Sequence, residues 1–148
     1  MSWVPQNAST AEKVKAAHDW LVRNVAYNEE AAYYGSYAYA YTVETDPWSA
    51  YGALVAKSCV CQGYALAFSA ILNAIGIESN YAHTDNHVWN RVLVDGSWYH
   101  VDVTWDDPVP DSGFDWLPST EYFLKSDQGL RAIGDSTHQE WWLVGPAC

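Results

Sequence analysis

The sequence feature that most constrains the fold is the dipeptide Asp95-Gly96, which separates two segments of alternating apolar and polar residues. The first segment covers 88–94 and the second covers 97–103. An Asp-Gly pair in this setting is a strong signal for a two-residue β-hairpin turn, because both turn positions need a positive φ. The sequence therefore predicts an antiparallel hairpin whose strands meet at this dipeptide.

This register places Trp89 across from Asp102 and sorts the side chains of the hairpin onto two faces. The apolar face carries Val88, Val92, Val94, Tyr99, Val101 and Val103. The opposite face carries His87, Trp89, Arg91, His100 and Asp102. Diagonal neighbours on one face lie about 7–8 Å apart, so His87 and Asp102 are within reach of an imidazole to carboxylate hydrogen bond. A histidine oriented by an aspartate is one half of a nucleophilic catalytic triad.

Two helices are predicted before the hairpin. Ser9 and Glu12 have the spacing of a capping box, and apolar residues then recur every three or four positions, which indicates a first helix near 10–26. A second helix begins around 58–61 with an apolar face, and a glycine at 76 is typical of its end. Cys61 therefore lies in the first turn of the second helix.

The predicted position of Cys61 suits a nucleophile. Unpaired backbone N–H groups and the positive end of the helix dipole both favour a thiolate over a thiol. The N–H of Cys61 also offers one donor for an oxyanion hole, and a second donor is expected from Tyr51 or Trp48. Each residue alone has an ordinary structural explanation, since a lone cysteine is often a small buried hydrophobe and a strand histidine is often a satisfied polar group. The combination of Cys61, His87 and Asp102 favours catalysis.

The rest of the chain is predicted with less regular structure. A tyrosine-rich segment over 27–48 is interpreted as a packed surface loop, with a substrate-contacting lid as the alternative. An extended segment is expected near 78–83, a loop over 104–118 and a short strand over 121–125. Because no repeat or linker is evident, residues 1–148 are expected to form one domain with its core at about 10–126.

Charge and hydropathy exclude several classes of protein. The 148 residues carry 18 acidic and 7 basic side chains, and the net charge of -11 repels nucleic acid and anionic lipid. The expected partners therefore include neither nucleic acid nor a membrane into which the chain inserts. No apolar run approaches the roughly 20 residues of a membrane span, and the first residues lack the features of a signal peptide.

Metal binding and other cofactors are not expected from the sequence. A calcium site is the one metal site that the acidic residues suggest, and its candidate ligands are Asp102, Asp106, Asp107, Asp111 and Asp115. Their spacing does not match a twelve-residue calcium loop, and prolines interrupt it. His83 and His87 would lie roughly 13 Å apart on an extended strand, too far to share one zinc ion.

Three cysteines are too few for a disulfide framework, and their odd number leaves at least one free thiol. If a bridge exists, it is expected between Cys59 and Cys148, because Cys59 and Cys61 are too close to pair without strain. For Cys59 we favour a structural role, with redox control of Cys61 as the alternative.

Three motifs resemble the transglutaminase-like superfamily, in its bacterial branch of candidate cysteine proteases. They are Val-Cys-Gln-Gly-Tyr-Ala at 60–65, Asn-His-Val-Trp-Asn-Arg-Val at 86–92 and Trp-Tyr-His-Val-Asp-Val-Thr-Trp-Asp-Asp-Pro at 98–108. The resemblance covers about 10–126. It implies an α+β, papain-like transglutaminase-core fold in which the nucleophile helix packs on an antiparallel sheet. It also assigns nucleophile, base and orienting acid to Cys61, His87 and Asp102, and suggests an extracellular or cell-surface location in a bacterium.

These observations predict thiol-dependent acyl transfer on peptide or protein amides through a thioester. Hydrolysis by a cysteine peptidase or amidase is favoured over crosslinking by a protein-glutamine gamma-glutamyltransferase. A catalytically silent module that binds peptide or glycan through its aromatic residues is the alternative from another class. No oligomeric state is predicted.

Overall fold

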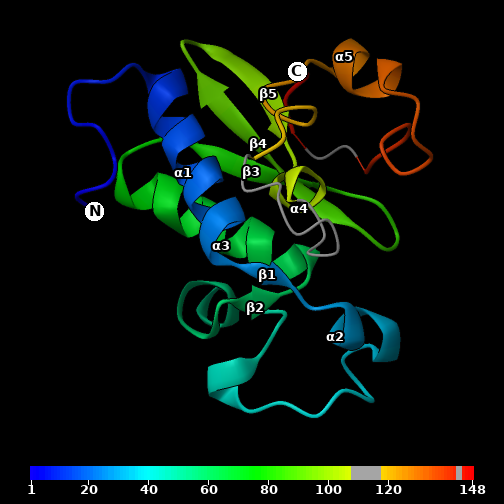
Figure 1. The fold of residues 1–148 in the computed structure, drawn as a ribbon. Helices are drawn as coiled ribbons and strands as arrows, with labels where there is room; N and C mark the ends of the chain where they lie inside the picture. Colours follow the sequence, from blue (N-terminus) through cyan, green and yellow to red (C-terminus); the bar gives the residue numbers. More distant parts are fainter. Residues whose placement is uncertain (108–117, 143–144) are drawn as a thin grey trace.

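The computed structural model describes residues 1–107, 118–142 and 145–148, in which helices pack against an antiparallel sheet (Figure 1). The sheet has the order β3 (Ser79–His83), β4 (Val88–Val94) and β5 (Ser97–Val101). Helix α3 (Cys61–Ala74) packs on β4, and α1 (Thr10–Asn24) packs against α3. The predicted α+β arrangement, with a helix that begins at Cys61 lying on an antiparallel sheet, is confirmed. Among the described residues, no helix combines the length and apolar character needed to cross a membrane.

Helix α1 begins at the predicted capping box. Ser9 accepts a hydrogen bond from the Glu12 backbone N–H at 3.2 Å, and the Glu12 carboxylate accepts one from the Ser9 N–H at 2.8 Å. The helix ends at Asn24, two residues earlier than predicted. It ends there because the backbone becomes extended in β1 (Ala26–Tyr27). This strand pairs in parallel with β2 (Ser58–Cys59), which lies just before α3 in the chain.

The hairpin has the predicted register. Val94 pairs with Ser97, and the turn residues Asp95 and Gly96 have φ of 50° and 84°. The second strand is shorter than expected, because β5 ends at Val101. Asp102 then caps the short helix α4 (Val103–Asp106), its carboxylate accepting the Trp105 N–H at 3.1 Å. The loop predicted from 104 therefore begins with a helical turn.

The two faces of the sheet are covered by different parts of the chain. The apolar face contributes Val92, Val94 and Val101 to the main core, which it forms with α1 and α3. The opposite face is not left to solvent. A smaller core lies there and consists of Ala82, Trp89, Tyr122, Leu130 and Trp141. The segment after residue 118 thus closes the second face of the sheet.

The strand predicted over 121–125 is wrong. This segment is a series of turns and bends, with a single bridge between Lys125 and His100. Leu124 has a φ of 50°, in the left-handed region, which is incompatible with a continuous strand. Helix α5 (Asp127–Ala132), which was not predicted, follows directly. Most of the predicted loop over 104–118 lies outside the described residues.

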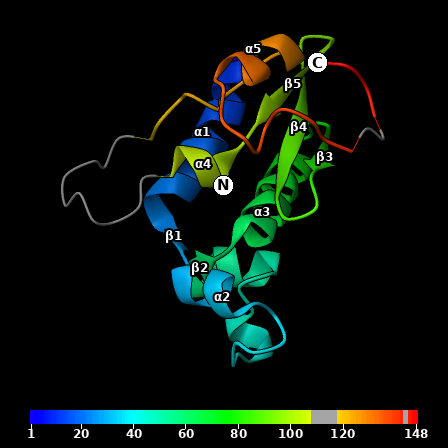
Figure 2. The same ribbon diagram turned by 90° about the vertical axis from the view of Figure 1, so that its right-hand side faces the viewer.

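The tyrosine-rich segment forms a separate projection, residues 28–57, here called the tyrosine lobe. It contains α2 (Glu29–Tyr34), η1 (Val43–Thr45) and η2 (Gly52–Ala56) and lies at the end of the molecule opposite α5 (Figures 1 and 2). Tyr33 and Tyr37 are exposed. The rings of Tyr39 and Tyr41 contact Trp48. The lobe is thus a surface segment, as predicted, but it includes short helices.

The close packing around Gly63, in the first turn of α3, leaves no room for a larger residue. A Cβ at this position would lie 2.5 Å from Cys59 Cβ and 2.7 Å from the Pro47 carbonyl oxygen. Overpacking of this kind costs about 1–3 kcal/mol, so we expect Gly63→Ala to lower the free energy of unfolding by that amount. Urea denaturation of both proteins measures it.

Gly129→Ala is the matched control, because Gly129 also lies in a helix. A Cβ there meets only side-chain atoms, the nearest being Ser126 Oγ at 3.1 Å. Since alanine favours a helix over glycine by about 1 kcal/mol, this variant is expected to change stability by no more than that. Equal effects of the two substitutions would contradict the packing limit at Gly63.

Candidate active site

Cys61 is the first residue of α3, and its position depends on the segment before it. The Cys59 carbonyl accepts the Asn28 N–H at 2.9 Å, and the Val60 N–H donates to the Pro47 carbonyl at 3.0 Å. Val60 provides no side-chain cap for the helix. The first N–H groups of a helix have no partners within it, so Cys61 lies at a start where these donors are available to an anion.

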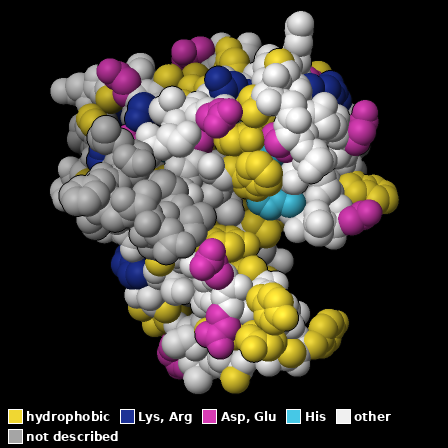
Figure 3. Space-filling model, turned by 45° about the vertical axis from the view of Figure 1, so that its right-hand side comes forward, with side chains coloured by type: hydrophobic (Ala, Val, Ile, Leu, Met, Phe, Trp, Pro, Cys, Tyr) yellow, Lys and Arg dark blue, Asp and Glu magenta, His cyan; other side chains and the backbone are white. Residues whose placement is uncertain are grey.

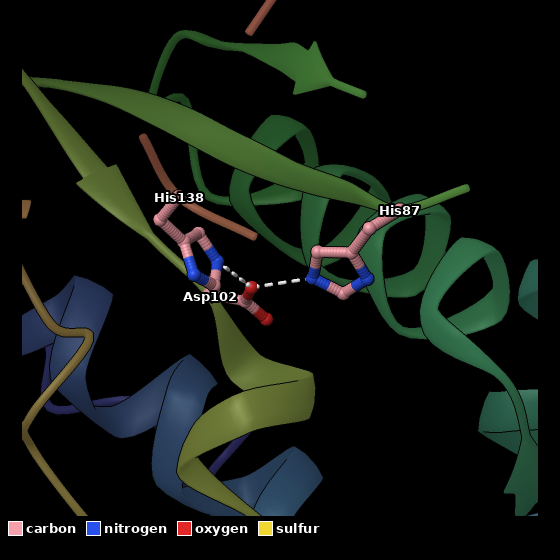
Figure 4. Close-up of side chains that lie close together, drawn as sticks. All are labelled: His87, Asp102 and His138. Carbon is pink, nitrogen blue, oxygen red and sulfur yellow. Dashed lines mark hydrogen bonds and ion pairs between the residues drawn. The ribbon is translucent and has the colours of Figure 1, made fainter. Parts of the chain in front are cut away.

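His87 and Asp102 are joined by a short hydrogen bond. Nε2 of His87, directly before β4, lies 2.6 Å from Oδ2 of Asp102, directly after β5. The other ring nitrogen, Nδ1, points away from the carboxylate (Figure 4). The His87 ring also stacks on Trp89, with centroids 5.7 Å apart. The hairpin therefore brings the predicted pair together, and its packing restrains the imidazole.

Charge interactions dominate the protonation of this pair. Burial of His87 disfavours the imidazolium, but Asp102, together with the Cys61 side chain, outweighs burial and raises the pKa of His87 to about 10. Asp102 is 1% exposed. Burial would raise the pKa of Asp102, yet His87 and His138 hold it below its usual range. The site therefore favours a charged imidazole beside an ionised carboxylate.

Cys61 and His87 line the same cleft, which has a volume of about 550 Å³. The tyrosine lobe contributes Trp48, and α3 contributes Cys61, Gln62, Ala65 and Leu66. Tyr81 and residues 83–88 form the remaining wall. Figure 3 shows a hollow between the tyrosine lobe and the rest of the molecule, with a histidine side chain at its surface and hydrophobic side chains around it. A ligand in the cleft would reach both Cys61 and His87.

The two candidate oxyanion donors differ in position. Trp48 lines the cleft, and its carbonyl accepts a hydrogen bond from the Gln62 side chain at 3.0 Å. Tyr51 is 49% exposed and is not among the residues that line the cleft. Trp48, but not Tyr51, therefore lines the same cleft as Cys61.

His138 is a member of the site that sequence reasoning missed. Its Nε2 lies 2.7 Å from the same Asp102 Oδ2 that contacts His87, so the carboxylate stands between two imidazoles (Figure 4). Its Nδ1 lies 2.9 Å from Oδ1 of Asp135. The only local signal is the three-residue spacing of Asp135 and His138, which does not indicate where this segment docks.

Two clusters in the described part of the chain bring three potential metal ligands within 4.8 Å of one another. One is His87, Asp102 and His138, in which both imidazoles bond to the central carboxylate. The other is His100, Asp127 and Cys148. Trp89 Nε1–H donates to Nδ1 of His100 at 3.0 Å, so the His100 proton lies on Nε2, 2.7 Å from the Asp127 carboxylate. Hydrogen bonds thus account for the histidine and carboxylate groups of both clusters.

The other two cysteines have different surroundings. All three cysteines are free, so the bridge considered between Cys59 and Cys148 is not present. Cys59 is fully buried in the main core, and burial raises the pKa of its thiol. Burial and the Asp127 carboxylate raise the pKa of Cys148 to about 11. Neither thiol lines the cleft, and the core position of Cys59 fits a structural role.

The fold and the arrangement of Cys61, His87 and Asp102 agree with a family match. The sequence profile of the Transglutaminase-like superfamily matches residues 3–103, and the chain belongs to this family. The matched range includes all three residues, but it ends before the segment that supplies His138.

Individual relatives are more distant. The chain is 24% identical over 157 residues to Kyphoscoliosis peptidase of Mus musculus, covering 93% of this chain and 22% of that protein. The chain thus spans less than a quarter of that relative. Among solved structures, it is similar to a transglutaminase at 21% identity and a TM-score of 0.57, covering 67% of this chain and 28% of that one. It is also similar to a candidate cysteine protease of Cytophaga hutchinsonii at 24% identity and a TM-score of 0.55, covering 76% and 37%. The structural likenesses establish the fold.

The His87 to Asp102 pair predicts a pH dependence of stability. Because folding raises the pKa of His87 from 6.5 to about 10, its charge stabilises the fold fully below pH 6.5, and this contribution is lost as the pH rises toward about 10. The difference in unfolding free energy between the parent and His87→Gln is therefore expected to shrink across that range. Urea denaturation at several pH values measures the difference.

His83→Gln is the control for this experiment, because His83 is exposed on β3 and its ring stacks on that of Trp142, whereas His87 is paired with a buried carboxylate. Its effect on the free energy of unfolding is expected to stay constant over the same pH range. A difference for His87→Gln that does not decline with rising pH would show that the ion pair does not stabilise the fold.

Proposed function

We propose that this chain is a cysteine-dependent acyl-transfer enzyme that acts on peptide or protein amides. Cys61 is the nucleophile, His87 is the general acid and base, and Asp102 orients His87. One observation carries the proposal. His87 bonds to the buried Asp102 carboxylate through Nε2, while the ring faces the cleft that also contains Cys61 at the start of α3. A nucleophile, a base and a group that orients the base define this chemistry.

The raised pKa of His87 supports an imidazolium at rest, and we propose that the Cys61 sulfur attacks as the thiolate beside it. In the first step the Cys61 sulfur attacks the amide carbon, and a C–S bond forms. His87 then donates its proton to the leaving nitrogen, and the C–N bond breaks to leave a thioester. In the second step, an acceptor attacks the thioester and loses a proton to His87. The C–S bond breaks, and the thiolate returns with the imidazolium.

Donors around Cys61 can stabilise the negative oxygen of the tetrahedral intermediate. The backbone N–H of Cys61 is one donor, because it lies at the uncapped start of α3. We propose the indole N–H of Trp48 as the second donor, because Trp48 lines the same cleft. Tyr51 lies outside the cleft lining and is given no role.

Hydrolysis is the proposed outcome, with water as the acceptor. The cleft is a surface hollow that water can enter (Figure 3). Two of the relatives carry the names of a peptidase and a candidate cysteine protease, which supports hydrolysis. Crosslinking to an amine is the second candidate, because a transglutaminase is among the similar structures.

The first test is the pH dependence of alkylation at each cysteine, mapped by peptide mass spectrometry. Cys61 is expected to react at a lower pH than Cys59 and Cys148, because only Cys61 has an imidazolium beside it. His87→Ala is expected to remove this difference, whereas Cys59→Ala is expected to preserve it. If Cys61 in the parent reacts like the other two thiols, the catalytic assignment is wrong.

The second part of this test identifies the product. Incubation with a protein substrate yields peptide fragments for a peptidase, ammonia without isopeptide bonds for a deamidase, and ammonia together with isopeptide bonds for a crosslinking enzyme. Cys61→Ala is expected to lower turnover by at least about a thousandfold. If the parent gives no product and both proteins bind the same peptide equally, the binding-module alternative is correct instead.

The proposed role of Trp48 predicts a change in kcat. Trp48→Phe keeps a ring beside Tyr41 but removes the N–H, and the loss of one oxyanion donor lowers kcat by about a hundredfold. We expect this loss with little change in KM. Tyr51→Phe is the control, since Tyr51 lies outside the cleft lining. A larger effect of Tyr51→Phe than of Trp48→Phe would assign the donor to Tyr51.

A further inference from the structure

The carboxylate of Asp102 receives more hydrogen bonds than a catalytic triad requires. Its Oδ1 accepts the Trp105 backbone N–H at 3.1 Å. Its Oδ2 contacts Nε2 of His87 at 2.6 Å and Nε2 of His138 at 2.7 Å. Three groups from three segments therefore fix the position of one buried carboxylate.

His138 is itself held on its other side. Nδ1 of His138 lies 2.9 Å from Oδ1 of Asp135, which also accepts the backbone N–H groups of Thr137 and His138 at 2.8 and 2.9 Å. Oδ2 of Asp135 accepts a hydrogen bond from the Tyr122 hydroxyl, with the two oxygens 2.9 Å apart. The hydrogen bonds therefore run from Asp135 through His138 to the catalytic pair.

Aromatic rings restrain the His138 imidazole as well. Its ring centroid lies 4.7 Å from that of Trp89, 4.8 Å from that of Tyr122 and 4.9 Å from that of Trp105. The side chain is fully buried and is not among the residues that line the cleft. His138 is therefore closely packed and lies outside the cleft lining that a substrate would meet.

We propose that His138 is a positioning residue of this active site, which holds the Asp102 carboxylate in the orientation that receives the His87 N–H. The inference rests on the proposed function of Cys61 and His87. Without the His138 donor, Oδ2 of Asp102 keeps only one partner, and the carboxylate gains freedom to rotate about its terminal torsion. The His87 imidazole then loses the fixed orientation that presents its other nitrogen to the cleft.

Two substitutions separate the hydrogen bond from the packing. His138→Gln keeps an N–H donor near the position of Nε2, whereas His138→Phe keeps the ring but has no donor. A hydrogen bond to a charged group is worth about a tenfold change in an equilibrium or rate. We expect His138→Phe to slow alkylation of Cys61 at neutral pH by about that factor and to lower kcat with KM unchanged. His138→Gln is expected to restore most of the loss.

His18 offers a matched control. It is fully buried, and its two ring nitrogens contact the carboxylates of Asp19 and Asp106 at 2.8 and 2.9 Å, much as His138 lies between Asp135 and Asp102. Because His18 does not contact Asp102 or line the cleft, His18→Phe is expected to lower the Tm without changing the pH profile of Cys61 alkylation. A general loss of packing would instead affect both variants alike.

The outcomes distinguish this inference from the proposed function. If Cys61 in the parent already reacts like an ordinary thiol, the proposed function fails. Suppose instead that Cys61 in the parent is alkylated at a lower pH than the other two cysteines. If His138→Phe then folds and keeps both the pH dependence of Cys61 alkylation and the kcat of the parent, the positioning role is wrong. If His138→Phe does not fold, Asp135→Asn provides the test, because it weakens the hydrogen bond between residue 135 and the His138 imidazole without opening a cavity. A smaller loss in the same direction supports the inference, and an unchanged Cys61 profile overturns it.

Discussion

A buried carboxylate costs several kcal/mol unless its charge is paired and its oxygens accept hydrogen bonds, and this constraint governs the arrangement around Asp102. Asp102 directly follows β5, and its side chain caps α4 and contacts two imidazoles. Each partner comes from a different part of the chain, so the carboxylate is satisfied only when all parts are docked. The same contacts that permit Asp102 to be buried also orient His87 toward the cleft. Stability and the proposed chemistry therefore depend on one group.

The position of the nucleophile has a separate origin. The parallel pairing of β1 with β2 aligns the chain immediately before α3, and Gly63 permits the first turn of α3 to lie against Cys59 and Pro47. Cys59 thus packs in the main core, while Cys61, two residues later, lines the cleft. Backbone pairing on one side and hairpin register on the other bring Cys61 and His87 together, although 25 residues of intervening chain separate their positions in the sequence.

Local signals explain what could be predicted from the sequence. The turn at Asp95-Gly96 determines the hairpin register, and the Ser9 capping box determines the start of α1. Both depend on residues within a few positions of one another. The docking of His138 depends instead on a contact with Asp102, which lies 36 residues earlier in the sequence. No periodic apolar pattern predicts this contact. The incorrect strand over 121–125 has the same cause, because alternation alone does not reveal the left-handed backbone at Leu124.

The sheet brings two distant parts of the chain, the helix with Cys61 and the segment with His138, to one site. Its apolar face packs on α3, which carries Cys61, whereas its other face packs on the segment that carries His138. His87 precedes β4 at the end of the sheet, where its ring reaches Asp102 on one side and the cleft on the other. The matched family region, residues 3–103, supplies the proposed nucleophile, the proposed base and the carboxylate that orients the base. The segment beyond that region buries the second face of the sheet. In doing so it brings His138 to the buried Asp102 carboxylate, which depends on His138 for one of its three hydrogen bonds.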